Sequence, residues 1–414
     1  MANVSSSNGL EKRPKLRFPG FDEPYKHITL GEIASLVNRT DPKADAPIMM
    51  LSAGNGFIMQ SEKYSRDNAG QSLKKYILLK QGELAYNHGA SKAKQYGCCY
   101  ELTEKEARIP YVYHCFKISE TEYTPYIAMA LNNSKMDKQL KRLVSSSVRM
   151  DGLLNISFED YMSVTLFVPS SKEQKHIADF INRLDERIKA QEKLVASLKK
   201  YKRGVFEAIF TRKLRLVPKA RQSDWTAFEL SDFATRITRK NNGATDIPLT
   251  ISAQYGLIDQ RDFFSKVVAS SDMSGYYLLR RGEYAYNRST SNDYPFGSIK
   301  RLELYNEGAV STLYLCFAIK EDVVLSNFAK WYFESSQWHR GVNEICAEGA
   351  RNHGLLNVPT DDFFDTVHIL PSDIEEQAQI AAFLSRVHDK LAKAQEELDK
   401  LIGLRNGLMQ QLFI

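Results

Sequence analysis

The chain of 414 residues is long enough for two domains with full hydrophobic cores. Its hydrophobic fraction of 43% and charged fraction of 26% are ordinary for a globular protein, and the net charge of +6 permits an anionic partner without requiring one. No apolar run approaches the roughly 20 residues of a membrane span, the polar start lacks the core of a signal peptide, and the five cysteines have neither metal-ligand spacing nor disulfide density. We therefore expect a cytoplasmic protein with no membrane segment, in which Cys115 and Cys316 lie in the core.

The first part of the chain predicts a lead-in followed by a globular domain. Residues 1–20 are rich in positive charge around KRPKLRFPGF and are expected to be flexible. The first domain is predicted over 21–170, because short β-rich runs (YVYHCFKI, MSVTLFVP) alternate with Gly, Asn and Ser turns and with a helical stretch near 125–143. This mixture indicates the α+β fold class.

A long amphipathic helix is predicted over residues 171–213. Ser170 and Glu173 have the spacing of a capping box, and apolar residues then recur at alternating steps of three and four, as in a helix that packs against another helix. The predicted pairing positions are Ile177, Ile181, Leu184, Ile188, Val195 and Leu198. At 1.5 Å per residue such a helix is about 55–60 Å long, which exceeds the needs of a globular domain.

The same succession returns in the second half. A linker is predicted over 214–224, a second domain over 225–371 and a second long helix over 372–414, with Ser372 and Glu375 as its capping box. Its pairing positions are Ile380, Leu384, Val387, Leu391, Leu398 and Leu401. Even the charged interruption of the apolar stripe recurs, Lys202 matching Arg405. We expect the two helices to pair with each other; the alternative is two unrelated amphipathic helices, each packed on its own domain.

The globular domains are also copies of each other. Residues 51–58 align with 251–258, and the Gly-Glu-Leu-Ala-Tyr-Asn run at 82–87 returns as Gly-Glu-Tyr-Ala-Tyr-Asn at 282–287. The offset between matched positions drifts only from 200 to 203 along the whole chain. The sequence therefore predicts a tandem repeat of one domain-plus-helix module, with approximate two-fold symmetry.

The two copies differ most just after the shared Tyr-Asn. Residues 88–97 read HGASKAKQYG, whereas residues 288–297 read RSTSNDYPFG. Free divergence of surface loops explains this difference, and so does a recognition loop whose chemistry was changed in each copy. Both interpretations stay open at this stage.

No catalytic motif stands out in the sequence. A phosphate loop, a dinucleotide fingerprint, an Asn-Pro-Pro-Tyr-like methyltransferase motif, a His-Glu-x-x-His zinc site and a nucleophile elbow are all absent. We therefore expect a chain that is not an enzyme and that holds no metal or cofactor.

The polar residues of the divergent loops suit nucleic acid, because arginine reads guanine, asparagine and glutamine read adenine, and lysine neutralises phosphates. For Arg149 and Arg351 a surface salt bridge is an equally good explanation. The predicted DNA-binding residues are Asn55, Asn87, His88, Ser91, Lys92, Lys94, Arg149, Gln254, Asn287, Arg288, Ser289, Ser291, Asn292, Arg351 and Asn352.

Taken in this order, the chain resembles the specificity subunit of a Type I restriction–modification enzyme. The resemblance rests on the KLRFPGF lead-in, on the Leu-x-x-Gly-Glu runs at 79–83 and 279–283, and on the Pro-x-x-x-Glu-Gln-x-x-Ile-Ala-x-Phe start of the first long helix at 169–180, repeated with one inserted residue at 371–383. It covers essentially the whole chain in the family's order.

The resemblance implies a function and partners. Each domain would be a target-recognition domain that reads one half of a bipartite double-stranded DNA site, and the two long helices would pair antiparallel and set the unread gap. The helices would also dock two methyltransferase subunits that use S-adenosylmethionine, and restriction subunits that use ATP and Mg²⁺ would complete the enzyme. Because the loops differ, we expect an asymmetric site, and changes in residues 288–292 should alter only the second half-site.

Other functions stay open on the residues alone. The chain is alternatively a protein-binding scaffold with two domains on a coiled-coil rod, an enzyme such as a nuclease with a site that no motif reveals, or a small regulator that binds DNA without partners. DNA binding that weakens steeply with salt separates the first hypothesis from the scaffold.

Overall fold

The structure is a computed structural model that describes residues 13–63, 70–92, 94–144, 154–218, 222, 224–252, 255–263, 272–291, 294–346 and 354–414, together with the backbone of residues 2–3. The chain divides into two compact units. Unit 1 comprises residues 1–192 and 396–414, and unit 2 comprises residues 193–395. Each unit thus contains one globular domain and one part of each long helix.

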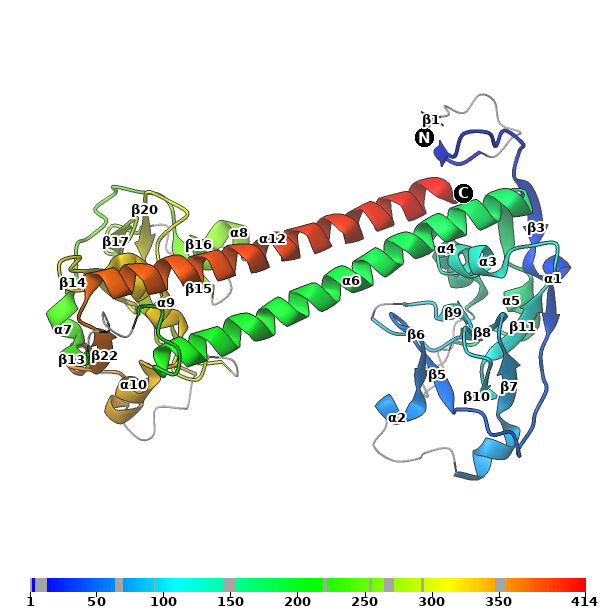
Figure 1. The fold of residues 1–414 in the computed structure, drawn as a ribbon. Helices are drawn as coiled ribbons and strands as arrows, with labels where there is room; N and C mark the ends of the chain where they lie inside the picture. Colours follow the sequence, from blue (N-terminus) through cyan, green and yellow to red (C-terminus); the bar gives the residue numbers. More distant parts are fainter. Residues whose placement is uncertain are drawn as a thin grey trace. The chain divides into compact units, whose positions relative to one another are not determined.

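Short strands and short helices make up the domain of unit 1 (Figure 1). Its helices are α1 (Leu30–Ile33), α2 (Gln60–Lys63), the 3₁₀ helix η1 (Gly70–Lys75), α3 (Thr124–Leu131), α4 (Ser134–Leu143) and α5 (Phe158–Met162). Its strands are β1 (Ala2–Asn3), β2 (Leu16–Arg17), β3 (Lys26–Thr29), β4 (Ala34–Leu36), β5 (Met49–Ser52), β6 (Gly56–Met59), β7 (Ile77–Lys80), β8 (Glu83–Asn87), β9 (Cys98–Glu101), β10 (Glu106–Ile109), β11 (His114–Ile118) and β12 (Thr165–Val168).

The domain of unit 2 repeats this succession. Its helices are α7 (Leu230–Phe233), α8 (Gln260–Phe263), α9 (Ser326–Glu334), α10 (His339–Ile345) and α11 (Thr360–Phe364). Its strands are β13 (Trp225–Glu229), β14 (Ala234–Ile237), β15 (Leu249–Ser252), β16 (Gly256–Asp259), β17 (Tyr277–Arg280), β18 (Tyr284–Asn287), β19 (Ser298–Arg301), β20 (Glu307–Val310), β21 (Leu315–Ile319) and β22 (Val367–Pro371).

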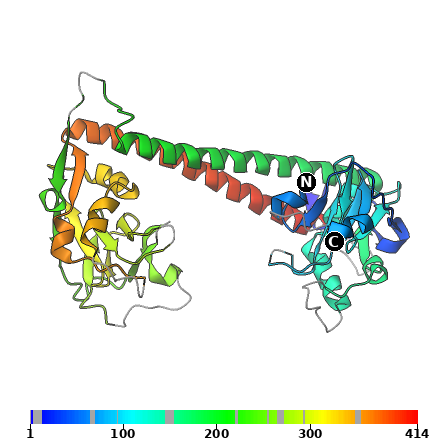
Figure 2. The ribbon, with the colours of Figure 1, turned by 90° about the horizontal axis from the view of Figure 1, so that it is seen from below.

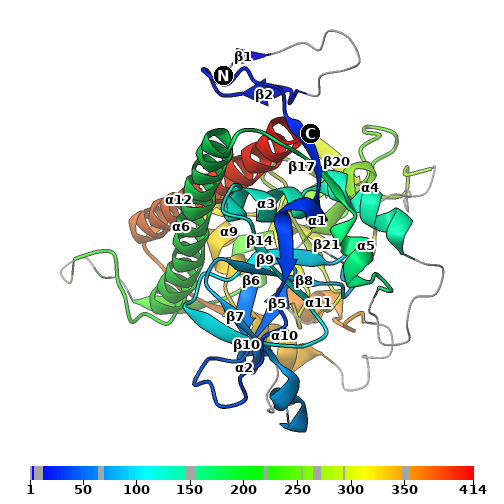
Figure 3. The same ribbon diagram turned by 90° about the vertical axis from the view of Figure 1, so that its right-hand side faces the viewer.

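Each domain is built around a four-stranded antiparallel sheet. The strand order is β4-β11-β8-β9 in unit 1 and β14-β21-β18-β19 in unit 2, and matched residues occupy matched registers: Cys115 lies opposite Ala85, and Cys316 lies opposite Ala285. Both cysteines are buried, as the sequence predicted. In unit 1, α3 lies between this sheet and the ends of the long helices (Figure 3). The repeated sheet confirms the α+β fold class and the duplication.

A second pairing brings the two ends of each domain together at the start of a long helix. β3 pairs with β12, and β13 pairs with β22, so that a strand near the start of each domain lies beside the strand that leads into the helix. The long helices are α6 (Ser171–Phe210) and α12 (Ile374–Leu412). Both begin and end within three residues of the predicted bounds.

The two long helices pair antiparallel, and in each unit their segments lie side by side (Figures 1 and 2). In unit 1, Arg405 binds Asp185 with Nε–Oδ1 and Nη2–Oδ2 distances of 2.5 and 3.1 Å. The matched crossing in unit 2 joins Lys202 Nζ to His388 Nδ1 at 3.2 Å. Of the predicted pairing positions, three are half-buried (Leu184, Leu198 and Leu391) and the rest are buried (Ile177, Ile181, Ile188, Val195, Ile380, Leu384, Val387, Leu398 and Leu401).

The predicted capping boxes at the helix starts are wrong. The Glu173 carboxylate does not return to Ser170; it is fully buried and binds the Arg17 guanidinium through two hydrogen bonds of 2.8 and 2.7 Å. At the second helix the Asp373 side chain, not that of Ser372, accepts a hydrogen bond from the Glu375 backbone N–H. A buried ion pair thus takes the place that local capping was expected to fill.

The Arg17–Glu173 pair also changes the view of the lead-in. Arg17 is only 5% exposed, so the described segment around it is anchored on the start of α6, while residues 1 and 4–12 of the predicted flexible lead-in lie outside the described residues. The predicted linker is likewise anchored, because Arg215 makes the matched ion pair with Glu376. The predicted helix near 125–143 is broken into α3 and α4, where the Asn133 side chain caps α4 by accepting from the Lys135 N–H.

Candidate nucleic-acid interface

The divergent loops are the hairpin loops that join β8 to β9 in unit 1 and β18 to β19 in unit 2. We call residues 88–97 and 288–297 the two recognition loops. The same hydrogen bond closes both: the Tyr86 hydroxyl donates to the Tyr96 carbonyl at 2.6 Å, and the Tyr286 hydroxyl donates to the Phe296 carbonyl at 2.9 Å. The loops therefore differ in sequence, but their ends are joined by the same hydrogen bond.

A glycine ends each recognition loop for a physical reason. Gly97 and Gly297 have φ angles of 83° and 76°, in the left-handed region that side chains disfavour. A Cβ atom at these positions would lie 2.4 and 2.1 Å from the carbonyl oxygens of Asn87 and Asn287. Both copies keep glycine because no other residue fits.

The shared asparagines and serines also shape the loops. The Asn87 side-chain oxygen accepts from the Gly89 N–H at 2.9 Å, and Asn287 accepts from the Ser289 N–H at 3.0 Å. Further along, the Ser91 N–H donates to the Lys94 carbonyl at 3.0 Å, and the Ser291 N–H donates to the carbonyl of Tyr294 at 3.1 Å. These turns fold both loops in the same way.

Each recognition loop is joined to the segment that follows α4 or α10. The Leu154 N–H donates to the His88 carbonyl at 2.9 Å, and the Leu356 N–H donates to the Arg288 carbonyl at 3.0 Å. In unit 2 the Thr290 N–H also donates to the Gly354 carbonyl at 2.7 Å. The loops and these segments thus form one continuous surface region in each unit.

The first side chain of each loop bridges neighbouring carbonyl groups. The His88 ring nitrogens Nδ1 and Nε2 lie 2.8 and 2.9 Å from the carbonyl oxygens of Leu154 and Val112. Arg288 donates from Nη1 to the Val358 carbonyl at 3.1 Å and from Nη2 to the Leu313 carbonyl at 2.9 Å. Both side chains therefore reach the β10–β11 or β20–β21 turn as well as the segment that begins at residue 154 or 354.

The predicted DNA-binding residues occupy different settings. Some are exposed on turns: Asn55, Ser91, Lys92, Ser289 and Ser291. Others are engaged in the loop itself: Asn87, His88, Asn287 and Arg288, together with Lys94, whose Nζ donates to the Asn132 carbonyl at 2.7 Å. Arg149, Gln254, Asn292, Arg351 and Asn352 lie outside the described residues. DNA contact by any of these side chains stays a prediction.

Three exposed apolar side chains were missed by the sequence analysis. Tyr255 is 61% exposed on the β15–β16 turn, at the position that matches Asn55. Leu313 is 59% exposed on the turn that Arg288 contacts, and Tyr111 is 50% exposed on the matching turn of unit 1. The alignment of the two copies could have identified Tyr255, because it occupies the position of Asn55, which the sequence predicts to bind DNA.

The described titratable groups near the recognition loop of unit 1 include two histidines and a cysteine. The His114 ring lies 5.0 Å from that of His88, and its Nε2 is 2.9 Å from the Ile156 carbonyl oxygen. Burial lowers the pKa of His114, and the hydrogen bond to Ile156 opposes that shift. Burial raises the pKa of the Cys98 thiol to about 11, which disfavours the reactive thiolate.

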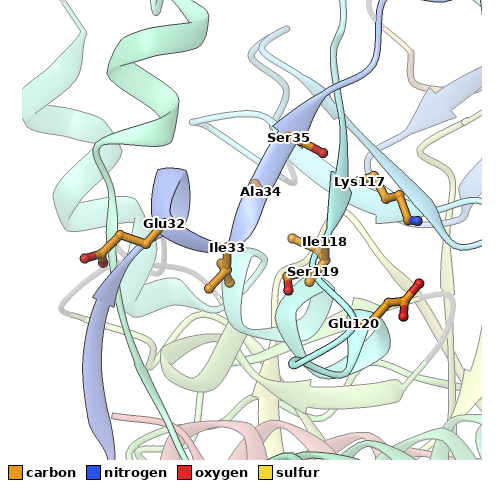
Figure 4. Close-up of a pocket in the computed structure, with 8 residues that line it drawn as sticks. All are labelled: Glu32, Ile33, Ala34, Ser35, Lys117, Ile118, Ser119 and Glu120. Atoms are coloured by element: carbon orange, nitrogen blue, oxygen red, sulfur yellow. The ribbon is translucent and has the colours of Figure 1, made fainter.

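Other candidate sites are weaker. A shallow hollow of about 360 Å³ at the edge of the sheet in unit 1 is lined by residues of α1, β4 and β11, including Glu32 and Lys117 (Figure 4). Hydrogen bonds from the Thr29 backbone and side chain lower the pKa of Glu32, so this carboxylate is occupied as a cap. Among the described residues no cluster of His, Cys, Asp or Glu suits a metal ion, and no helix carries the apolar stretch that crossing a bilayer requires.

Comparison with known proteins establishes the fold. No family model matches the sequence, and no curated protein matches it. The S subunit of the Type I restriction–modification system from M. genitalium is 14% identical, and the match covers 97% of this chain and 99% of that chain with a TM-score of 0.59. A structure on complex assembly and conformational transition of the type I R-M system matches with 13% identity, 96% and 98% coverage and a TM-score of 0.50.

A further similar structure is the HsdS subunit from Thermoanaerobacter tengcongensis, with 13% identity, 96% and 97% coverage and a TM-score of 0.47. The M. genitalium match spans both repeated modules and both long helices. The chain therefore has the fold of Type I specificity subunits, as the sequence motifs indicated.

Proposed function

We propose that the chain is the DNA sequence-specificity subunit of a Type I restriction–modification system, in which each domain reads one half of an asymmetric bipartite DNA site. The observation that carries this proposal is the contrast within each recognition loop. The two ends of the loop are held by the same hydrogen bonds in both units, whereas the exposed side chains differ apart from the shared Ser91 and Ser291. Such a constant frame with variable exposed residues suits two readers of different sequences.

The exposed chemistry favours double-stranded DNA as the ligand. In unit 1 the loop presents Lys92 beside Ser91, and in unit 2 it presents Ser289 and Ser291. Lysine neutralises phosphate, and serine hydroxyls donate to or accept from base edges of either kind. Tyr255 and Leu313 add apolar contact surface that suits a thymine methyl group. We accordingly expect the two half-sites to differ.

The long helices serve as spacer and docking element in this proposal. Helix α6 has 40 residues and α12 has 39, which corresponds to about 60 Å each. They would set the unread gap between the half-sites and bind two methyltransferase subunits carrying S-adenosylmethionine. Restriction subunits using ATP and Mg²⁺ would complete the complex. This chain itself would supply recognition and no catalytic group.

Methylation mapping tests the proposal. Genomic DNA from cells that express this chain with its methyltransferase partner is compared with DNA from cells that express the partner alone. We expect a new modified motif of two short, unlike blocks separated by a fixed gap. If the partner is bound and no new motif appears, the proposal fails, and a protein-binding scaffold with two domains becomes the better explanation.

The exposed loop residues allow a sharper version of this test. Exchanging Ser289 and Thr290 for the matching Gly89 and Ala90 should change only one block of the motif and leave the gap and the other block unchanged. Binding of the complex to duplex DNA should also weaken steeply with salt, because each phosphate contact releases a counterion. A protein-binding scaffold is expected to show neither the changed motif nor the steep salt dependence.

A further inference from the structure

The first residue of each recognition loop holds three separate segments of the domain together. In unit 1 these are the loop, the β10–β11 turn at Val112 and the segment that begins at Leu154. In unit 2 they are the loop, the β20–β21 turn at Leu313 and the segment near Val358. The contacted residues lie 24 and 66 positions away from His88, and 25 and 70 positions away from Arg288.

We propose that His88 and Arg288 are positioning residues, which set the shape of the recognition loops and thereby control specificity without reading a base themselves. This inference rests on the proposed function and refines it. His88 is buried and Arg288 is half-buried, and both direct their polar atoms to backbone carbonyl groups of their own unit. Both ring nitrogens of His88 are used in this way, which leaves no ring donor for a base edge, and Arg288 uses Nη1 and Nη2 of its five-donor guanidinium group.

The chemistry of the two residues is matched although the residues differ. Backbone carbonyl oxygens accept hydrogen bonds only, so each site needs a side chain with two donors that point in different directions. Arg288 meets this need with Nη1 and Nη2. His88 meets it when both ring nitrogens carry a proton, while the neutral ring donates to one of the two carbonyls.

The surroundings explain why histidine suffices in unit 1. His114 on β11 contacts the Ile156 carbonyl, which is the counterpart of the Val358 carbonyl that Arg288 reaches. Leu315 occupies the matching position in unit 2 and has no donor. In unit 1, His88 contacts the carbonyl of the turn and His114 contacts the Ile156 carbonyl. In unit 2, Arg288 alone contacts the two matching carbonyl groups. The groups facing His88 and His114 are Tyr86 on β8 together with Tyr161 and Glu159 on α5.

The test uses the assembled complex and scores each half-site separately. Arg288→Leu removes both donors from unit 2, and His88→Leu removes them from unit 1. For each variant, methylation is measured on duplexes with the full site and on duplexes with one altered base pair in either half. We expect the variant's own half-site to lose discrimination about tenfold, while the other half-site changes less than about twofold. Arg280→Leu, which removes an exposed charge from unit 2, should change neither.

A rescue variant separates positioning from base reading. His88→Arg combined with His114→Leu gives unit 1 the residues of unit 2 and should restore discrimination of the original first half-site. If Arg288 reads a base, Arg288→Leu will instead replace one letter of the motif, and the rescued unit 1 will acquire a new preference. Either result would overturn the proposal.

Amide hydrogen exchange provides a readout that does not depend on the proposed function. The Leu356 N–H donates to the Arg288 carbonyl and should exchange at least about tenfold faster in Arg288→Leu, while the amides of strand β18 keep their protection. Unchanged exchange at Leu356 would overturn the positioning role. Faster exchange in a protein that yields no methylated motif would leave positioning intact and count against the proposed function.

Discussion

The Arg215–Glu376 ion pair offers a direct test of what joins each domain to its helix. Glu376 is fully buried, and its carboxylate accepts from Arg215 Nε and Nη2 at 2.7 and 2.8 Å and from Trp225 Nε1 at 3.4 Å. The substitution Glu376→Gln keeps the size of the side chain and removes its charge. The largely buried Arg215 guanidinium then loses the carboxylate charge that it contacts through two hydrogen bonds.

The expected magnitude follows from this burial. Removing one partner of a buried ion pair costs about 3–5 kcal/mol, because the remaining charge is desolvated and uncompensated. Arg215 is 18% exposed and retains some hydration, so we place the loss near the lower end, about 3 kcal/mol. With a urea m-value of about 2–3 kcal/mol/M, the unfolding midpoint of unit 2 should fall by about 1–1.5 M.

Tryptophan fluorescence during urea unfolding is the appropriate assay. The three tryptophans, Trp225, Trp331 and Trp338, all lie in unit 2, so the signal reports on that unit alone. Glu375→Gln is the matched control, since Glu375 is exposed in the same helix turn and its removal has the same effect on the helix dipole. A midpoint for Glu376→Gln that equals the control midpoint would refute the assignment of a stabilising role to the buried pair.

Further predictions concern the loops, the core and the helix pairing. Gly297→Ala should destabilise unit 2 by at least about 1–2 kcal/mol because Gly297 has a positive φ. Gly204 on α6 has open space around it, so Gly204→Ala should stabilise unit 2 by about 0.5–1 kcal/mol. Tryptophan-monitored urea unfolding measures both changes. Burial lowers the pKa of His368 from 6.5 to about 4, so the unfolded chain binds the proton more readily, and unit 2 should lose about 3 kcal/mol as the pH falls from 6.5 to 4. His368→Gln should flatten this dependence in the same assay. A double-mutant cycle of Asp185→Ala and Arg405→Ala, with unfolding monitored by circular dichroism, should give a coupling energy of about 0.5–1 kcal/mol, because both side chains are about one-third exposed. A coupling energy near zero would show that this ion pair does not stabilise the helix pair.

The sequence predicted the architecture well because duplication makes the pattern visible. The offset of 200 to 203 residues located matching strands, and the alternating apolar stripe identified the pairing residues of both helices. These features depend on local periodicity, which a single sequence displays. The short breaks were harder to place, as the division between α3 and α4 at Asn133 shows.

Long-range polar contacts were not predictable in the same way. Glu173 has the spacing of a capping residue, but its partner Arg17 lies 156 residues earlier in the chain. The local pattern was present, and a stronger charge-assisted contact from a distant segment took its place. The same reason applies to Arg17 in the lead-in. Its positive charge alone does not reveal that it is buried against a carboxylate from a distant part of the chain.

The recognition loops show why divergence between copies does not by itself identify reading residues. Positions 88 and 288 differ as much as any pair in the loops, yet both must donate to a carbonyl of the adjacent turn, at Val112 or at Leu313. Each side chain joins its loop to the neighbouring turn, so a change at position 88 or 288 alters how the loop is built. An exposed side chain such as that of Lys92 is not directed to these carbonyl groups. A difference between the copies at a residue that is hydrogen-bonded within its own unit therefore reflects how the loop is built. Only differences at the other loop residues can determine which bases are read.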